Sequence, residues 1–371
     1  MRRAHLLWMG TAASVSWGCS MLLKFDGFGD CVDGACSSSA QPDASGSSTP
    51  PDASPGESST GPVCTPKKWP SPPDAGPGPG GATLVFAMKD VAFARELDGG
   101  TTVYDVNNRC VCPGGIVGAG TCRKDAAVTC DDPTTGADNE FVDLYDVFSK
   151  FQSVFLSDTE VNKSIAKGDA TLLVRVDDYE GTPDDGRVTV SLYNAVRVDA
   201  DGGSATPTFL PNEKWVADRG SLIGGNALTP KYVDDKAYVT GGILVARFPD
   251  AEIRLATERL QRFRIVTTDL RLVWPIAVDG GRSVGEFVGR IHVQSLVEIL
   301  GVLGWCPGTP QFIAVLTMCA RADVNASDDT GNLPCDSLSA QFRASFTPSQ
   351  KPDSFESETF AVSMCPDAGC R

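Results

Sequence analysis

Thirteen cysteines among 371 residues constrain the fold of this chain more than any other feature. Setting Cys19 aside leaves twelve, an even number, as a full set of disulfide bonds requires. Six bridges suit an oxidising compartment outside the cytoplasm. Spacing alone does not determine the pairing, but Cys31 and Cys36 are close enough for a local bridge, and we expect Cys64 to join the folded domain. The candidates are Cys31, Cys36, Cys64, Cys110, Cys112, Cys122, Cys130, Cys306, Cys319, Cys335, Cys365 and Cys370.

The N-terminus has the form of an export signal that ends at a lipid-modified cysteine. Two arginines precede an apolar run from Leu6 to Trp17, and the small Gly18 stands directly before Cys19. We therefore predict a signal peptide over residues 1–18 and lipid attachment at Cys19. The alternative is plain cleavage nearby, because Ser16 stands where such signals usually have an aliphatic residue.

The residue after the cysteine bears on localisation. Ser20 is not the Asp associated with inner-membrane retention of bacterial lipoproteins, which favours the outer membrane, facing the periplasm or the surface. No later segment has the ~18 consecutive apolar residues of a membrane-spanning helix. The membrane is thus expected as a partner only through the lipid.

The charge balance excludes one class of partner. The chain has 32 Lys+Arg against 47 Asp+Glu, for a net charge of −15. Nucleic-acid binding needs cations to neutralise phosphates, so we exclude nucleic acid as a partner. An acidic chain remains compatible with binding of metal cations, or simply with solubility.

Composition divides the chain into a tether and a domain. Residues 19–80 are dominated by Ser, Pro, Gly, Asp and Ala, which bury too little apolar surface to offset the entropy of ordering. This stretch is expected to be a disordered tether of roughly 60 residues that spans about 45 Å. Residues 81–371 contain no further linker-like break and are expected to form one domain.

Within that domain, apolar and β-branched runs alternate with glycine-rich and Asp-rich turns. The short connections favour antiparallel pairing, so we expect a mainly β fold: an antiparallel β-sandwich with a few inserted helices, stapled by disulfides. Helical periodicity and caps predict helices beginning after Asp138, after Ser157, near 292–303 and near 310–322. A first strand is expected from the runs 84–88 and 91–93 together. Further strands are expected at 101–106, 171–176, 187–198, 237–248, 252–256, 263–268, 270–276, 340–346 and 359–364.

The motif Gly281-Arg282-Ser283-Val284-Gly285 matches the nucleophile elbow of serine hydrolases. That motif requires a strand-to-helix turn and an acid followed by a histidine later in the chain. After removal of the signal only His292 remains, nine residues on, so a hairpin turn explains the match better. His292 itself is expected to be structural, since a zinc site would need a second histidine or paired cysteines.

Two acidic loops offer oxygen ligands for calcium, the only cofactor considered. The second, 323–329, begins like a calcium loop but lacks its later glycine and glutamate. Asx-turns and helix caps made by the same side chains are the alternative. The calcium candidates are Asp131, Asp132, Asp138, Asp143, Asp323 and Asn325. Trp215, Trp274 and Trp305 could likewise form a sugar-stacking platform, although Trp274 lies in an apolar run typical of a core.

Several segments resemble uncharacterised, cysteine-rich predicted lipoproteins and secreted proteins of myxobacteria. These are Gly18-Cys19-Ser20-Met21-Leu22-Leu23 with the following Phe25-Asp26-Gly27-Phe28, Gly136-Ala137-Asp138-Asn139-Glu140-Phe141, the strand Leu172–Asp177, and a C-terminal helical region with Cys306, Cys319 and Cys335. The resemblance extends over most of the chain after residue 80. It implies an envelope lipoprotein and supplies no activity or catalytic residue.

The sequence leaves three functional hypotheses. The first is a tethered surface binding or adhesion module with a glycan or a protein as its partner. The second is a structural or assembly component of the envelope without a small-molecule ligand. The third is a glycan hydrolase with an acid pair, which needs two carboxylates about 5–10 Å apart in a cleft. No catalytic residue can be named, and a non-enzymatic role is favoured.

Overall fold

The structure is a computed structural model. It describes residues 67–74, 76, 80–93, 104, 106, 139–151, 157–197, 205–225, 229–258, 260–276, 283–327, 333–352, 354–356, 363, 365 and 369–370. The chain divides into two units, Met1–Ser58 and Ser59–Arg371, and all described residues belong to the second. The expected signal peptide, Cys19 and most of the expected tether lie outside the described residues.

Ten strands of the described part form one sheet, which confirms the expected mainly β class. Neighbouring strands pair antiparallel, except β4 and β10, which are parallel. The strands are β1 (Ala82–Ala92), β2 (Thr171–Tyr179), β3 (Asp185–Val196), β4 (Val216–Asp218), β5 (Tyr232–Thr240), β6 (Ile243–Thr257), β7 (Gln261–Pro275), β8 (Ser283–His292), β9 (Ser337–Pro348) and β10 (Ser354–Glu356).

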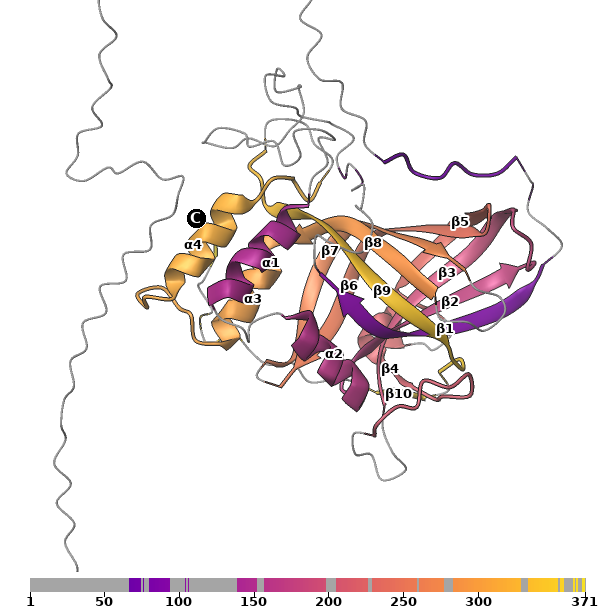
Figure 1. The fold of residues 1–371 in the computed structure, drawn as a ribbon, viewed down its shortest axis with the longest axis horizontal. Coiled ribbons are helices and arrows are strands. Elements are labelled where there is room, and N and C mark those ends of the chain that lie inside the picture. The colour runs from indigo at the N-terminus through magenta and orange to yellow at the C-terminus, as the bar shows by residue number, and fades with distance from the viewer. Residues whose placement is uncertain are drawn as a thin grey trace, which may run out of the picture. The chain divides into compact units, whose positions relative to one another are not determined.

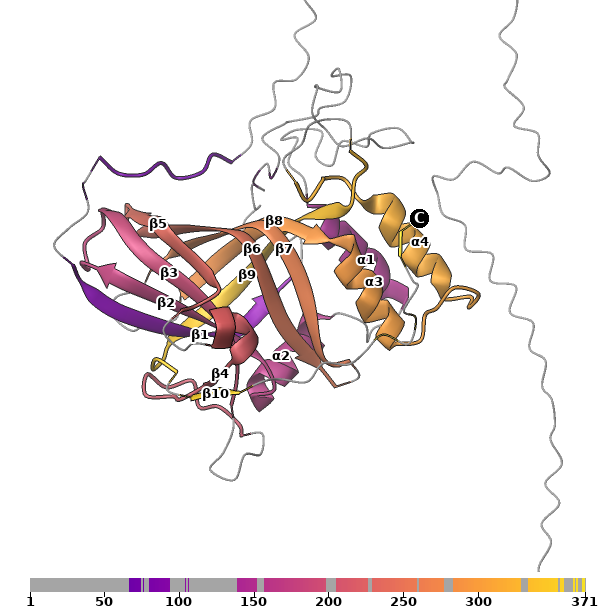
Figure 2. The same ribbon diagram turned by 180° about the vertical axis from the view of Figure 1, so that it is seen from behind.

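The sheet closes on itself because β3 pairs with β5 as well as with β2. Around the resulting ring the order is β1, β2, β3, β5, β6, β7, β8, β9 and back to β1. Figures 1 and 2 both show β5 beside β3 at the end of the ring away from the helices. The two layers expected of a sandwich are therefore opposite walls of one continuous sheet, and β4 and β10 branch outward from β3.

Aromatic and aliphatic side chains fill the ring. Trp274 packs edge-on against Phe86, with ring centroids 4.5 Å apart, and Phe287 stacks on Phe342 at 5.2 Å. All eight strands of the ring, which are all but β4 and β10, contribute side chains to this core. A cavity of about 10 Å³ between Met88 and its apolar neighbours has room for about one water. The interior is thus a packed core.

Four helices cover one part of the ring. They are α1 (Glu140–Phe151), α2 (Asp158–Lys167), α3 (Val293–Val302) and α4 (Phe312–Arg321). All four were expected, and the caps of α2 are as predicted: Ser157 accepts from the Glu160 N–H, and Gly168 has φ 83°. In Figures 1 and 2, α1, α3 and α4 lie together at one end of the ring, with α4 outermost.

Several strand boundaries differ from expectation. The strand expected at 237–248 is two, β5 and β6, joined by a turn at Gly241 and Gly242 with φ 56° and 79°. The three strands expected from 252 to 276 are parts of the long strands β6 and β7. Strand β8 was not expected at all. The strand expected at 359–364, like most of 101–106, lies outside the described residues.

Residues 67–70, near the end of the expected tether, pack against the folded domain. Trp69 is half-buried, and Lys67 forms a parallel bridge with Tyr104. Packed structure therefore begins before residue 81, the expected start of the domain. Among the described helices, none combines the length and apolar composition that crossing a membrane requires.

Candidate functional site

The helical end of the molecule contains the described disulfides. Cys306 is bonded to Cys365, and Cys319 to Cys370, so both bridges join the α3–α4 region to the C-terminal segment. Cys335 is disulfide-bonded as well. These five of the twelve candidates are confirmed as disulfide cysteines. The others (Cys31, Cys36, Cys64, Cys110, Cys112, Cys122 and Cys130) lie outside the described residues.

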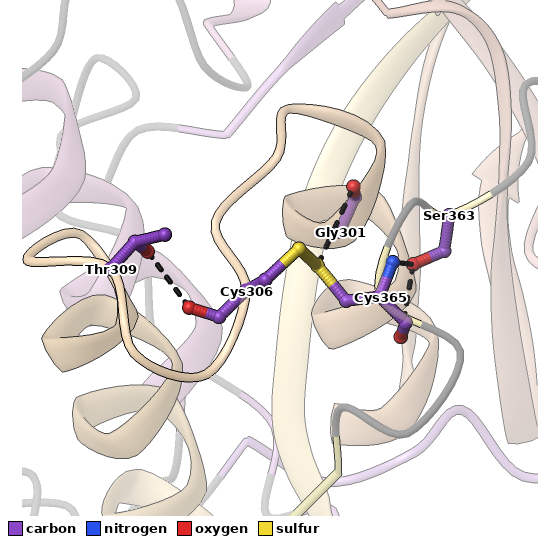
Figure 3. The surroundings of a disulfide bond; sticks show 5 residues. All are labelled: Gly301, Cys306, Thr309, Ser363 and Cys365. Atoms are coloured by element: carbon purple, nitrogen blue, oxygen red, sulfur yellow. Dashed lines mark hydrogen bonds between the residues drawn. A yellow bond between two sulfur atoms is a disulfide. The ribbon is translucent and has the colours of Figure 1, made fainter.

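The surroundings of the first bridge explain how the C-terminal segment reaches α3 (Figure 3). A Cβ atom at Gly301 would lie 2.0 Å from Ser363 Oγ, so only glycine permits this close approach. The Cys365 N–H donates to Ser363 Oγ at 3.1 Å, and Thr309 Oγ1 donates to the Cys306 carbonyl at 2.8 Å. Backbone and side-chain contacts thus position both cysteines.

Helix α4 presents apolar side chains to solvent. Ile313 is 64% exposed and Leu316 50% exposed, and Ala320 is exposed one turn further on. Its opposite face, with Val315 and Met318, is buried in the core. The helix therefore carries apolar side chains on both faces, and the Cys319–Cys370 bridge holds it in place.

The second candidate calcium loop is closed by its own hydrogen bonds. Asn325 Oδ1 accepts from the N–H and the hydroxyl of Ser327 at 2.9 and 2.6 Å, and its Nδ2 donates to the Pro334 carbonyl. Asp323 Oδ1 accepts from the Ser339 N–H at 2.8 Å. These are the Asx-turn and capping contacts that were the alternative to metal ligation.

The first candidate calcium loop is described only in part. Asp143 lies on α1, and Asp131, Asp132 and Asp138 lie outside the described residues. Within the described ranges, no three His, Cys, Asp or Glu side chains come together as a metal site would require. Calcium binding by residues 131–143 stays a prediction.

The residues at the start of α1 have a structural role. Asn139 forms two hydrogen bonds with the backbone of Gln341, at 3.1 and 2.9 Å. Next to it, Glu140 is 2% exposed and accepts from Arg321 Nη1 of α4 at 2.6 Å. The Tyr104 N–H donates to the Gln341 side chain. Tyr104 and Asn139 therefore both contact Gln341 of β9.

A buried ionic cluster lies where β4 meets β6. Arg254 is ion-paired with Asp218 and with Glu252, and the Gly220 backbone leaves no room for a Cβ beside its guanidinium. Burial, followed by the charge of Glu252, raises the pKa of the nearby Tyr232 hydroxyl. Both carboxylates of this cluster are thus already neutralised by an arginine, unlike the free acid pair that a glycan hydrolase uses.

The hydrolase-like motif lies in a strand. Ser283 begins β8, and its hydroxyl accepts a hydrogen bond from Trp274 Nε1 at 2.7 Å. His292 ends the same strand and stands at the N-cap of α3. An antiparallel strand provides no strand-to-helix elbow at Ser283. The expected hairpin turn is wrong for residues 283–285, which belong to β8, and Gly281 and Arg282 lie outside the described residues.

The three tryptophans named as a possible sugar platform are mostly internal. Trp215 is 1% exposed and Trp274 0% exposed, so neither ring face is open to a sugar. Trp305 is partly buried and packs against the core. The sugar-stacking platform is therefore not formed by these residues.

Sequence reasoning missed a cluster on the outer wall, which we call the Trp69 stack: Lys67, Trp69, Tyr104 and Arg271. The Trp69 and Tyr104 rings are parallel, with centroids 4.1 Å apart and an angle of 12°. Arg271 lies over the outer face of Trp69 and Lys67 over that of Tyr104, each 4.3 Å from the ring centroid. Lys67-Lys68-Trp69, a basic and aromatic run within an otherwise Ser/Pro/Gly-rich stretch, was the available signal.

In the described residues the polar clusters therefore serve the fold. Two features at its outer side remain: the exposed face of α4, and the partly buried Trp69 stack, in which Tyr104 is 1% exposed and packs with Val273 and Val288. Helix α4 is bridged to the C-terminal segment, and Arg271 belongs to β7. Comparison of the chain with protein-family models, with curated proteins and with solved structures finds no match.

Proposed function

We propose that this chain is a lipoprotein of the bacterial outer membrane, attached through Cys19, whose folded part is a binding or adhesion module for a protein partner. The signal-like N-terminus, the Ser/Pro/Gly-rich stretch behind it and the disulfides of the folded part support export and anchoring. A tether gives such a module reach from the membrane surface.

The exposed apolar face of α4 carries the binding part of the proposal. Ile313 and Leu316 lie three residues apart and so share one side of the helix. A helix covalently bridged to the C-terminal segment loses little conformational entropy when it docks. Exposed apolar side chains on a rigid helix are typical of protein docking surfaces.

A protein fits this surface better than a glycan. The helix has no acidic residue, and its one basic residue, Arg321, is already paired with Glu140. Sugar sites instead need open aromatic faces and polar groups. The rings of Trp215 and Trp274 are buried and offer no such face. We therefore assign the partner to the protein class.

A second candidate is a structural or assembly component of the envelope that binds no small molecule. The packed ring favours it, because the cavity of about 10 Å³ inside the sheet cannot hold a ligand larger than a water. Both candidates predict contacts through the outer surface, and they differ in whether one partner binds at α4.

Labelling with radioactive palmitate tests the anchoring. We expect label in the parent chain and none in Cys19→Ala, which lacks the thiol that carries the lipid. Cys370→Ser is the control, because it also replaces one cysteine, here one from a disulfide, but leaves the proposed attachment site intact. Equal labelling of the parent and Cys19→Ala, or no label in either, would contradict the proposal.

Cross-linking and pull-down from envelopes test the docking surface. The Ile313→Asp/Leu316→Asp double variant places charge on the α4 face, and we expect it to lose a protein that the parent retains. Leu210→Asp is the control, since Leu210 is 54% exposed in a loop away from α4. Retention of the same proteins by all three chains would leave the structural candidate as the better one.

A further inference from the structure

The Trp69 stack has four layers in the order Arg271, Trp69, Tyr104, Lys67. Two cations enclose two parallel aromatic rings, so each ring has a cation on one face and a ring on the other. Such cation–π contacts are electrostatic and gain strength when the rings are partly removed from water. Burial is indeed the main cause of the raised pKa of the Tyr104 hydroxyl.

Both ends of the stack are fixed to the ring by ion pairs. Lys67 Nζ lies 2.7 Å from Glu286 Oε2 on β8. Arg271 Nη2 lies 3.3 Å from Asp269 Oδ2 on β7, where Asp269 has φ 48° and the register shifts before Arg271. The Tyr238 hydroxyl on β5 donates to the Pro70 carbonyl. Three strands thus hold residues 67–70.

Most of the described residues between the stack and β1 are exposed. They are Ser71, Pro72, Asp74, Gly76, Gly80 and Gly81, whereas Pro73 is half-buried and β1 is buried over residues 85–88. Figure 1 shows residues 67–74 as an indigo trace outside the strands, running toward the end of the ring where β1 begins. From Lys67 to Ala82 an extended chain reaches about 50 Å.

We propose that the Trp69 stack is a releasable clasp, which holds the membrane tether against the outer wall and, when it opens, lengthens the tether while the ring stays folded. Tension from the N-terminal side reaches Lys67 before it reaches β1. Residues 67–70 are joined to the wall by a few side chains, one isolated backbone bridge and one hydrogen bond to the Pro70 carbonyl, whereas β1 is paired with a strand on each edge. The weaker attachment therefore yields first.

The membrane side of this device rests on the proposed anchoring at Cys19, but the clasp itself does not. Its opening is a property of the purified chain, without lipid or partner. Loss of palmitate labelling would remove the anchor from the argument and leave the clasp to be tested separately.

Trypsin provides a local measurement, because Lys67 and Lys68 are its cleavage sites within the clasp. When opening is fast relative to cleavage, the cleavage rate follows the population of the open form. We expect Arg271→Ala to raise cleavage after Lys67 and Lys68 roughly fivefold, the effect of losing one cation–π contact. Trp69→Ala should raise it further. Mass spectrometry of the new N-termini identifies the cut.

Arg247→Ala is the matched control. Arg247 is ion-paired with the same Asp269, but it is absent from the Trp69 stack. Trypsin should cut the Arg247→Ala chain after Lys67 and Lys68 at the same rate as the parent. Near-UV circular dichroism and the Tm should be unchanged in Arg271→Ala and Arg247→Ala. Equal cleavage of the two variants, or faster cleavage that appears only together with a lower Tm, would overturn the clasp.

Single-molecule stretching measures the length of chain that is released when the clasp opens. Held near residue 19 and at the C-terminus, the parent chain should show a reversible extension step of up to about 50 Å before the ring unfolds, set by the residues between Lys67 and β1. Trp69→Ala should lack this step and retain the main unfolding event. A parent without the early step, or a variant with it, would refute the proposal.

Discussion

At the scale of single residues, Asn139 takes the place of a strand on β9. Pairing of β1 with β9 ends at Ala92 and Arg343, two residues short of Gln341 along that strand. The Asn139 side chain has a donor and an acceptor side by side, and both bond to the Gln341 backbone. An asparagine can therefore satisfy the backbone groups that the missing strand leaves open.

Asn139→Ala should destabilise the fold by roughly 2–3 kcal/mol, because two backbone groups lose their partners. Urea denaturation measures the change. Asn139→Asp keeps the acceptor for the Gln341 N–H and should lose less. Asn212→Ala, at an exposed position, should stay within about 0.5 kcal/mol of the parent. If Asn139→Ala matched Asn212→Ala, the strand-like role would be wrong.

Glu213 organises the loop before β4. It is 5% exposed, and its carboxylate accepts from the N–H and hydroxyl of Thr208, the Phe209 N–H and Arg197. Burial by itself would raise the pKa of Glu213, but the hydrogen bonds from Thr208 and Arg197 outweigh it and hold the pKa below its ordinary value. The ionised form is therefore the one the fold prefers.

The sign of the pH effect follows. The stability from ionised Glu213 is present above the unfolded pKa, about 4.3, and is lost as pH falls through the lower folded pKa. Glu213→Gln should be less stable than the parent at pH 7, and the difference should shrink toward pH 3. Thr208→Val removes the hydroxyl that donates to Glu213 and should cause a smaller loss of stability with the same dependence on pH. A difference independent of pH would contradict the assignment.

At the scale of elements, glycine residues account for two errors in the strand prediction: the merging of β5 with β6 and the omission of β8. Gly241-Gly242 between apolar runs is a hairpin signal, and reading it so would have separated β5 from β6. Gly285 and Gly289 made β8 resemble a turn. In the structure a Cβ at Gly285 would lie 3.0 Å from the Trp274 side chain, and one at Gly289 2.9 Å from the Leu270 backbone. These glycines admit close neighbours within a strand.

The two described disulfides differ in exposure, which predicts an order of reduction. Their sequence separations of 59 and 51 residues imply similar stabilisation, about 4 kcal/mol each by chain entropy. Cys365 is buried, whereas Cys370 is exposed. Mild reductant should therefore open Cys319–Cys370 first, as read by alkylation and mass spectrometry. Simultaneous loss of both bridges, or loss of Cys306–Cys365 first, would show that exposure is not what controls access.

At the scale of the whole molecule, the class of fold could be predicted from the sequence, but the contacts between residues far apart in the chain could not. Periodicity and turn chemistry predict local elements, so the four helices and most strands could be anticipated. Closure of the ring through β3 and β5, and the stacking of Trp69 on Arg271, join residues far apart in the chain. The run Lys67-Lys68-Trp69 stands out locally, but no local pattern encodes its partners Tyr104 and Arg271, and the Trp69 stack was therefore missed. The capping role of Asn325 depends on nearby residues and was among the alternatives.

Ring closure predicts that the described fold unfolds in one transition. Trp274 belongs to the core inside the ring, and Trp215 to a second cluster with Ala87, Leu173 and Tyr193 on the opposite face of the same strands. Opening either cluster exposes β1, β2 and β3, which the other needs. The two clusters are therefore expected to unfold together.

Fluorescence of the two tryptophans tests this. Replacing Trp215 or Trp274 by Phe in turn, and subtracting each signal from that of the parent, isolates the contribution of each residue. We expect both difference signals and far-UV circular dichroism to share one urea midpoint, after correction for the stability of each variant. An earlier transition for Trp215 would instead show that β4 and β10 open as a separate unit, since they branch outward from β3 and pair only at one side of the ring.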